Sequence, residues 1–191
     1  MASIFKHKPT GKTIRPDKSW KDERGVLHAS NWQIWDADYK TSMGIVEIVL
    51  ESPPDSRFYN WSHKDDGTIN KTAKALNDVN TVDKDGKPVL DDKGKQHVTR
   101  GVKTTLKQTV KKQQGSLLDQ TDWAVIRKAD KGTAIPSNIQ TWRDAIRTKA
   151  TEMETAIDNA SNTAAIEALF VAYDKDGKKT GILYDWPKLG S

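Results

Sequence analysis

The chain of 191 residues is long enough for one full domain or two small ones, and its hydrophobic residues, 35% of the total, can fill a core in either case. Charged residues make up 30% of the chain and the mean hydropathy is -0.76, which argues against one large enzyme core and for much solvated surface. The absence of cysteine excludes disulfide bonds, thiolate nucleophiles and cysteine-ligated zinc, and the net charge of +5 is modest for this length.

The first 62 residues are predicted to form a small β-rich module. Prolines and glycines recur throughout this segment, which leaves room only for short strands and turns. The clearest strand is Ile45–Leu50, an apolar run with a single charge, and the two prolines that follow it prevent its extension. A turn at Lys21–Gly25 is expected to lead into another short strand at Val26.

Residues 63–99 are predicted to form a linker or an exposed hairpin. Apolar residues thin out here, and a turn-like unit repeats at Asp83–Lys87 and Asp91–Lys95. The Asp-Gly pair in the first unit is a strong hairpin signal. Alternating aspartates also begin an EF-hand calcium loop, but neither copy carries the full ligand set or the closing glutamate. The repeats therefore favour turns over a metal site.

Residues 100–191 are predicted to form a helical module that a short β-hairpin closes. Apolar residues recur at every fourth position from Val102 and reach Leu118, which indicates an amphipathic helix. A short helix is expected from Thr163 to Phe170, and the chain is expected to turn back at Gly181–Trp186 as part of the closing hairpin. The predicted fold class is therefore α+β.

The longest predicted helix follows Pro136. Ser137 and Gln140 have the spacing of a capping box at its start. Because so long an apolar face needs cover, Trp123 and Trp142 are expected to pack the helices together. The apolar residues step by three and four and so share one face, namely Ile139, Trp142, Ile146, Ala150, Met153, Ile157 and Ala160.

No constellation of catalytic residues is recognisable in the sequence. The four histidines, His7, His28, His63 and His97, lie in separate turn-rich segments and are expected at the surface or in turns. Neither a dinucleotide-binding nor a P-loop glycine pattern occurs. We therefore expect no enzyme activity, no cofactor and no metal.

Basic residues concentrate between positions 100 and 150. Lysines on the polar side of an amphipathic helix are usually a solvated face, and no recognised nucleic-acid module occurs, so nucleic-acid binding is the less favoured alternative. Four acidic residues oppose eleven basic ones in this stretch, which are Arg100, Lys103, Lys107, Lys111, Lys112, Arg127, Lys128, Lys131, Arg143, Arg147 and Lys149.

Two segments resemble a known family of proteins. Lys21–Trp32, followed by Met43–Val46 and by Asp55–Tyr59, is similar to the N-terminal module of phage tail-fibre assembly proteins and related tail assembly chaperones, where a glycine turn precedes an Asn-Trp pair and a Gly-Ile step. Lys107–Trp123 is similar to the family's C-terminal signature, a helix that ends in Leu-Leu-x-x-Thr-Asp-Trp. As in the family, Ala134–Pro136, Trp142–Arg143 and a long helix follow.

The resemblance implies a protein without enzyme activity or cofactor that helps a phage tail fibre fold, trimerise or attach. Its partner is then a fibre or another tail protein, in the host cytoplasm during phage assembly. A permanent structural component of the phage tail or baseplate, retained in the virion, is the alternative.

The charged start of the chain does not fit a signal peptide, and no apolar run approaches a membrane span, so we expect a cytoplasmic protein without membrane contact. Within the β-rich module, six aromatic residues either anchor a partner or, as we favour for each of them, fill a small core. They are Trp20, Trp32, Trp35, Phe58, Tyr59 and Trp61.

Overall fold

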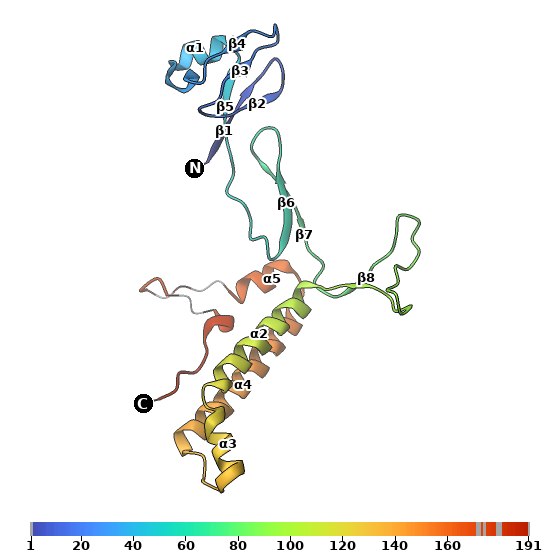
Figure 1. Ribbon diagram of the computed structural model, residues 1–191, viewed down its shortest axis with the longest axis vertical. Coiled ribbons are helices and arrows are strands. Elements are labelled where there is room, and N and C mark those ends of the chain that lie inside the picture. Colours follow the sequence, from blue (N-terminus) through green and yellow to red (C-terminus); the bar gives the residue numbers. More distant parts are fainter. Residues whose placement is uncertain (1, 171–172, 174, 179–180, 191) are drawn as a thin grey trace. The chain divides into compact units, whose positions relative to one another are not determined.

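The computed structural model describes residues 2–170, 173, 175–178 and 181–190, and the chain forms two compact units. The first unit spans Met1–Thr72 and the second spans Ala73–Ser191. Short strands dominate the first unit and open the second, whose remainder is largely helical (Figure 1). The predicted α+β class is therefore confirmed.

The first unit contains a three-stranded antiparallel sheet in the order β2-β1-β5. The central strand pairs along its whole length with β5, from Ser3 opposite Val49 to His7 opposite Ile45. This pairing confirms the strand that the sequence predicts at positions 45–50. The strands are β1 (Ser3–His7), β2 (Lys12–Ile14) and β5 (Ile45–Val49).

A small core joins the elements of the first unit. It contains the buried residues Ile14, Trp20, Trp32 and Ile45, each from a different element. Trp32 is fully buried, and its indole N–H donates to the carbonyl of Lys18 at 3.2 Å. Because a unit of this size buries little surface, its core depends on large side chains. The other elements are β3 (Trp20–Lys21), β4 (Leu27–His28), η1 (Trp32–Ile34), α1 (Ala37–Ser42) and the hairpin of β6 (Tyr59–His63) and β7 (Ile69–Ala73).

The predicted turn at positions 21–25 is confirmed by the ribbon of β3 and β4. Trp20 pairs with His28 and Lys21 with Leu27, so the chain reverses between them. Gly25 has a φ of 80°, a backbone conformation that glycine adopts without steric cost.

The second unit begins with a three-way junction of short ribbons, residues 79–99, called here the junction. One ribbon consists of β8 (Val79–Asn80) and β9 (Val98–Thr99). Three backbone hydrogen bonds lie at its inner end. The N–H of Thr81 donates to the carbonyl of His97 at 2.8 Å, and the N–H of His97 donates to the carbonyl of Val89 at 2.7 Å. The N–H of Val89 donates in turn to the carbonyl of Thr81 at 3.0 Å. These bonds close a ring of three residues that are eight positions apart, from which two further ribbons extend (Figure 1).

Aspartate side chains close the turns at the ends of those two ribbons. Asp83 Oδ1 accepts the backbone N–H groups of Asp85 and Lys87, each at 2.9 Å, and Asp91 makes the same two bonds in the second turn. Gly86 has a left-handed φ of 78° in the first turn. The repeats are therefore turns, as predicted, and these carboxylate oxygens serve the backbone.

Two long helices, α2 and α4, pack along each other in the second unit. α2 contributes the buried residues Val102, Leu106 and Val110, and all seven residues of the predicted α4 stripe are buried. Both amphipathic helices and the short helix after them are therefore confirmed. The helices are α2 (Val102–Asp119), α3 (Asp122–Lys131), α4 (Ser137–Asn159) and α5 (Thr163–Ala168).

The start of α4 does not form the predicted capping box. Pro136 occupies the N-cap position, and no side chain caps the first turn. Gln140 donates instead to the carboxylate of Asp144 at 2.8 Å. Ser137 is already the first helical residue, so its hydroxyl lies one position too late to cap the helix.

The C-terminal segment departs from the predicted hairpin. Residues Ile182–Tyr184 form a 3-10 turn, η2, where the returning strand is expected. The remaining residues of that hairpin include 171, 172, 174, 179 and 180, which lie outside the described residues. Leu183 is buried, and Trp142 of α4 donates its indole N–H to the carbonyl of Pro187 at 2.9 Å, so this segment packs against α4.

Candidate functional site

Residues 117–123 span the end of α2, the turn after it and the start of α3, and they are called here the corner. They carry the Leu-Leu-x-x-Thr-Asp-Trp signature. Arg143 of α4 donates to the carbonyl of Leu118 and to Thr121 Oγ1, each at 2.8 Å, and pairs with Asp122 Oδ1 at 2.8 Å. Arg143 and Thr121 are both buried. Because a guanidinium is planar and binds several acceptors in a fixed geometry, this contact sets the direction in which α3 leaves α2.

The tryptophan of the signature faces solvent. Trp123 is 50% exposed, so the prediction that it packs the helices together is wrong, whereas Trp142 is buried as predicted. The reason lies in helix geometry. Thr121 and Asp122 face Arg143, and the next residue of a helix is rotated by about 100° from the one before it.

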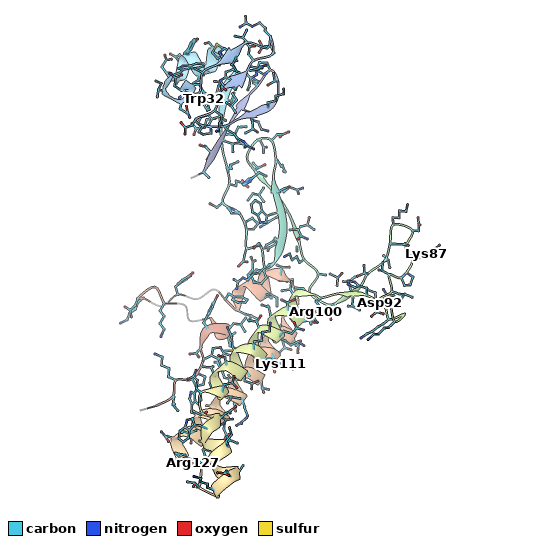
Figure 2. All side chains as sticks on the ribbon, in the orientation of Figure 1. Trp32, Lys87, Asp92, Arg100, Lys111 and Arg127 are labelled. Atoms are coloured by element: carbon cyan, nitrogen blue, oxygen red, sulfur yellow. The ribbon has the colours of Figure 1, made fainter. Side chains whose placement is uncertain are left out.

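Trp123, Ile126 and Arg127 form a stripe on α3, called here the α3 patch, because residues three and four positions apart share one helix face. Ile126 is 66% exposed. The guanidinium of Arg127, labelled in Figure 2, lies 4.9 Å from the centroid of the Trp123 ring. Within the part of the chain that the structure describes, the buried Nε of Arg127 has no hydrogen-bond acceptor. The patch thus offers an aromatic ring, an aliphatic side chain and a cation.

The six aromatic residues of the first unit do not share one surface. Trp20, Trp32 and Phe58 are buried, which agrees with the core role that the sequence favours. Trp35 packs against the core while partly buried, and Tyr59 is also partly buried. Trp61 is 37% exposed. The sequence did not single out the α3 patch as a site, although its signature contains Trp123.

Basic residues at the start of α2 are not simply a solvated face. Lys107 Nζ pairs with the carboxylate of Asp158 at 2.8 Å, and Lys103 donates to the carbonyl of the same residue at 2.9 Å. Both lysines therefore join the start of α2 to the end of α4. Lys111, labelled in Figure 2, and Lys112 are exposed as predicted.

A polar cluster in the first unit surrounds Asp22, whose side chain is buried. Its carboxylate accepts the backbone N–H groups of Arg24 and Val26 at 2.9 Å each, and it lies 3.3 Å from His28 Nε2. The His28 ring stacks on Trp20 with ring centroids 4.4 Å apart. The cluster therefore links the β3–β4 turn to the core.

His7, which the sequence places at the surface or in a turn, is instead the buried last residue of β1. Its side chain is buried, with Nδ1 2.9 Å from Thr10 Oγ1 and Nε2 3.2 Å from the Glu23 carboxylate. Its ring lies against Trp20, with centroids 4.8 Å apart. A histidine at the end of a central strand is buried when neighbouring turns supply partners for both ring nitrogens, which a single sequence does not reveal.

The stability of the first unit is expected to depend on pH through Asp22. Burial raises the pKa of this carboxyl, but hydrogen bonds from Val26, His28 and Arg24 outweigh it and lower the pKa from 3.8 to about 2. The carboxylate therefore stabilises the folded unit above the unfolded pKa, and this contribution disappears as the pH falls from about 4 to about 2.

We expect Asp22→Asn to destabilise the first unit at neutral pH and to flatten this pH dependence. Thermal unfolding of both proteins, followed by near-ultraviolet circular dichroism over the acid range, measures the effect. Equal losses of stability in the two proteins over that range would contradict the assignment to Asp22.

Comparisons with known proteins leave the site to be argued from this chain alone. No protein-family model, no curated protein and no solved structure matches the chain. Among the described residues, no group of three or more histidine, aspartate or glutamate side chains is arranged to hold a metal ion. No helix in that part of the chain is both long and apolar enough to span a membrane.

Proposed function

We propose that the protein is a phage tail-fibre assembly chaperone that binds a fibre or another tail protein through the α3 patch. The observation that carries this proposal is the exposure of Trp123 two positions after the buried Thr121 of the corner. Tryptophan and arginine dominate the residues that contribute most to protein interfaces. Because Arg143 holds the corner in place, the patch is already ordered before binding, which lowers the entropic cost of association.

The charge of α3 favours a protein partner over a nucleic acid. Nucleic-acid binders concentrate positive charge on one face to neutralise phosphates. α3 instead mixes both signs, with three basic residues (Arg127, Lys128 and Lys131) and two acidic ones (Asp122 and Asp130). Retention on DNA at low salt that weakens steeply as salt rises would point to the nucleic-acid alternative.

Trp123→Ala is expected to weaken fibre binding by about 30- to 1,000-fold, the range of a tryptophan at an interface hot spot. The full chain is co-expressed with candidate tail-fibre proteins, and soluble trimeric fibre is scored with and without the chain. Affinity is then measured by calorimetry on the purified partners. Because the ring is half exposed, the thermal midpoint of the variant should stay near that of the wild type.

Trp61→Ala is the matched control, since it removes a partly exposed tryptophan from the other unit. Unchanged affinity of Trp123→Ala would exclude the α3 patch. If no fibre depends on the wild-type chain or co-purifies with it, the proposed function fails. Stoichiometric copies of the chain in purified particles would favour the permanent tail component instead.

A further inference from the structure

Two Asp-Gly pairs occupy the same place in turns of the same shape. The first turn spans residues 64–68, and the second, at the end of one ribbon of the junction, spans residues 83–87. In each turn the N–H of the first residue donates to the carbonyl of the fifth, at 2.8 Å and 2.9 Å, and the N–H of the glycine donates to the carbonyl of the first, at 3.1 Å in both. The two glycines have left-handed φ values of 86° and 78°. The chain has three such pairs, which are Asp66-Gly67, Asp85-Gly86 and Asp176-Gly177.

An Asp-Gly pair is a place where aspartate rearranges without an enzyme. The backbone nitrogen of the glycine attacks Cγ of the protonated side chain, an N–Cγ bond forms, and the carboxyl hydroxyl leaves with the amide proton as water. A second water then adds to the main-chain carbonyl carbon of the aspartate in the five-membered ring and breaks its bond to the nitrogen. The product, isoaspartate, has the original mass, but the main chain now passes through Cβ and Cγ. Glycine favours the attack because it has no Cβ to obstruct it.

The turn at residues 64–68 protects its aspartate from this reaction. Asp66 Oδ1 accepts the hydroxyl of Thr68 at 2.6 Å and its backbone N–H at 2.9 Å. These bonds lower the pKa of Asp66, so less of the reactive protonated form is present. Gly67 is buried, its carbonyl accepts the N–H of Glu51 at 3.0 Å, and a Cβ on it would overlap the carbonyl of Val49. The glycine nitrogen therefore has little freedom to approach the carboxyl group.

The turn at residues 83–87, marked by Lys87 in Figure 2, has none of this protection. Every residue from 82 to 88 is exposed, and a Cβ on Gly86 would meet no atom within 4 Å beyond its chain neighbours. Among the described residues, the carboxylate of Asp85 has no hydrogen-bond or ion-pair partner. The hydrogen bonds that hold this turn in that part of the chain are made within the turn itself, so it opens by a local fluctuation.

We propose that Asp85 is a site of spontaneous isomerisation to isoaspartate, whereas Asp66 keeps its normal linkage. Water is the only co-reactant. Asp83 Oδ1 accepts the N–H groups of Asp85 and Lys87, each at 2.9 Å, and the isomerised main chain is one atom longer between these two donors. One oxygen then no longer fits both, so the end of this ribbon loosens as the protein ages. The reaction needs no partner and is independent of the proposed function.

The test incubates the full chain at mildly acidic pH and samples it over several weeks. Peptide mapping with electron-transfer fragmentation distinguishes isoaspartate from aspartate and scores each Asp-Gly pair separately. We expect isoaspartate to accumulate at Asp85 at least about tenfold faster than at Asp66, the factor that one hydrogen bond to a charged group is worth. Absence of isoaspartate at Asp85, or equal rates at the two positions, would overturn the assignment.

Three variants separate the effect of the turns from that of the sequence. Asp85→Asn forms the same ring with loss of ammonia, so its peptide should become a mixture of aspartate and isoaspartate, and an asparagine that persists would mean that the turn blocks the attack. Asp85→Glu keeps the charge but requires a six-membered ring, so a rearranged product at the same rate would contradict the mechanism. Thr68→Val removes one bond to Asp66 and should raise the rate there by about threefold or more. An unchanged rate would refute the protection that the hydroxyl provides.

Discussion

Trp32→Ala is expected to unfold the first unit at 25 °C while the helices of the second unit remain folded. Trp32 is fully buried, and Phe5 contacts its ring edge to face with centroids 5.0 Å apart. Removing a buried tryptophan costs about 3 to 5 kcal/mol through lost burial and the cavity left behind. That loss equals the total stability that so small a core supplies, about 3 to 5 kcal/mol.

Two-dimensional NMR of the full chain measures this outcome. The amide signals of the first unit should collapse into the narrow range of an unfolded chain, while those of α2 and α4 keep their dispersion. Trp61→Ala, which removes a side chain that is 37% exposed, should leave both sets intact. A dispersed first-unit spectrum in Trp32→Ala would show that the core tolerates the cavity.

Arg143→Ala is expected to destabilise the second unit by about 1 to 3 kcal/mol, the usual cost of removing the hydrogen-bond partner of a buried polar group. The variant removes the Arg143 donor from the buried hydroxyl of Thr121 and from the carbonyl of Leu118, which still accepts the backbone N–H and the hydroxyl of Thr121. Asp122 is half exposed and water replaces its partner, so it contributes the smaller share. Arg143→Lys should recover only part of the loss, because the lysine ammonium lies one bond nearer the backbone than the arginine Nη1, which makes all three contacts.

Urea unfolding followed by far-ultraviolet circular dichroism measures the loss, since the long helices lie in the second unit. Arg147→Ala is the control on the same helix: its pair with Asp144 is exposed and contributes about 1 kcal/mol or less. Equal midpoints for Arg143→Ala and Arg147→Ala would mean that the corner does not depend on the guanidinium.

The helical part of the fold could be predicted because its signal is local. The stripe from Ile139 to Ala160 repeats over many turns, and a long apolar stripe has no stable place except against another element. The strand at Ile45–Val49 was predictable for a similar reason, since it is a short apolar run with clear ends.

The candidate sites depend on contacts between distant residues, which periodicity does not encode. Tryptophan is a residue type that the sequence places in a core. The side chain of Trp123 faces outward because Arg143 contacts the residues just before it in the corner. His7 likewise depends on Glu23, which a turn brings near. The ring of the junction depends on three residues eight positions apart, whereas the sequence shows only the turns between them.

The pairing of α2 with α4 has a consequence for synthesis on the ribosome. α2 ends at Asp119 and α4 at Asn159, so 40 further residues must be made before the whole partner helix has been added. At about 5 to 20 residues per second, that takes roughly 2 to 8 s. The first unit precedes α2 in the chain and is free to fold in the meantime. Throughout those seconds the nascent α2 presents Val102, Leu106 and Val110 to water, so this stretch is where the growing chain most needs protection from aggregation.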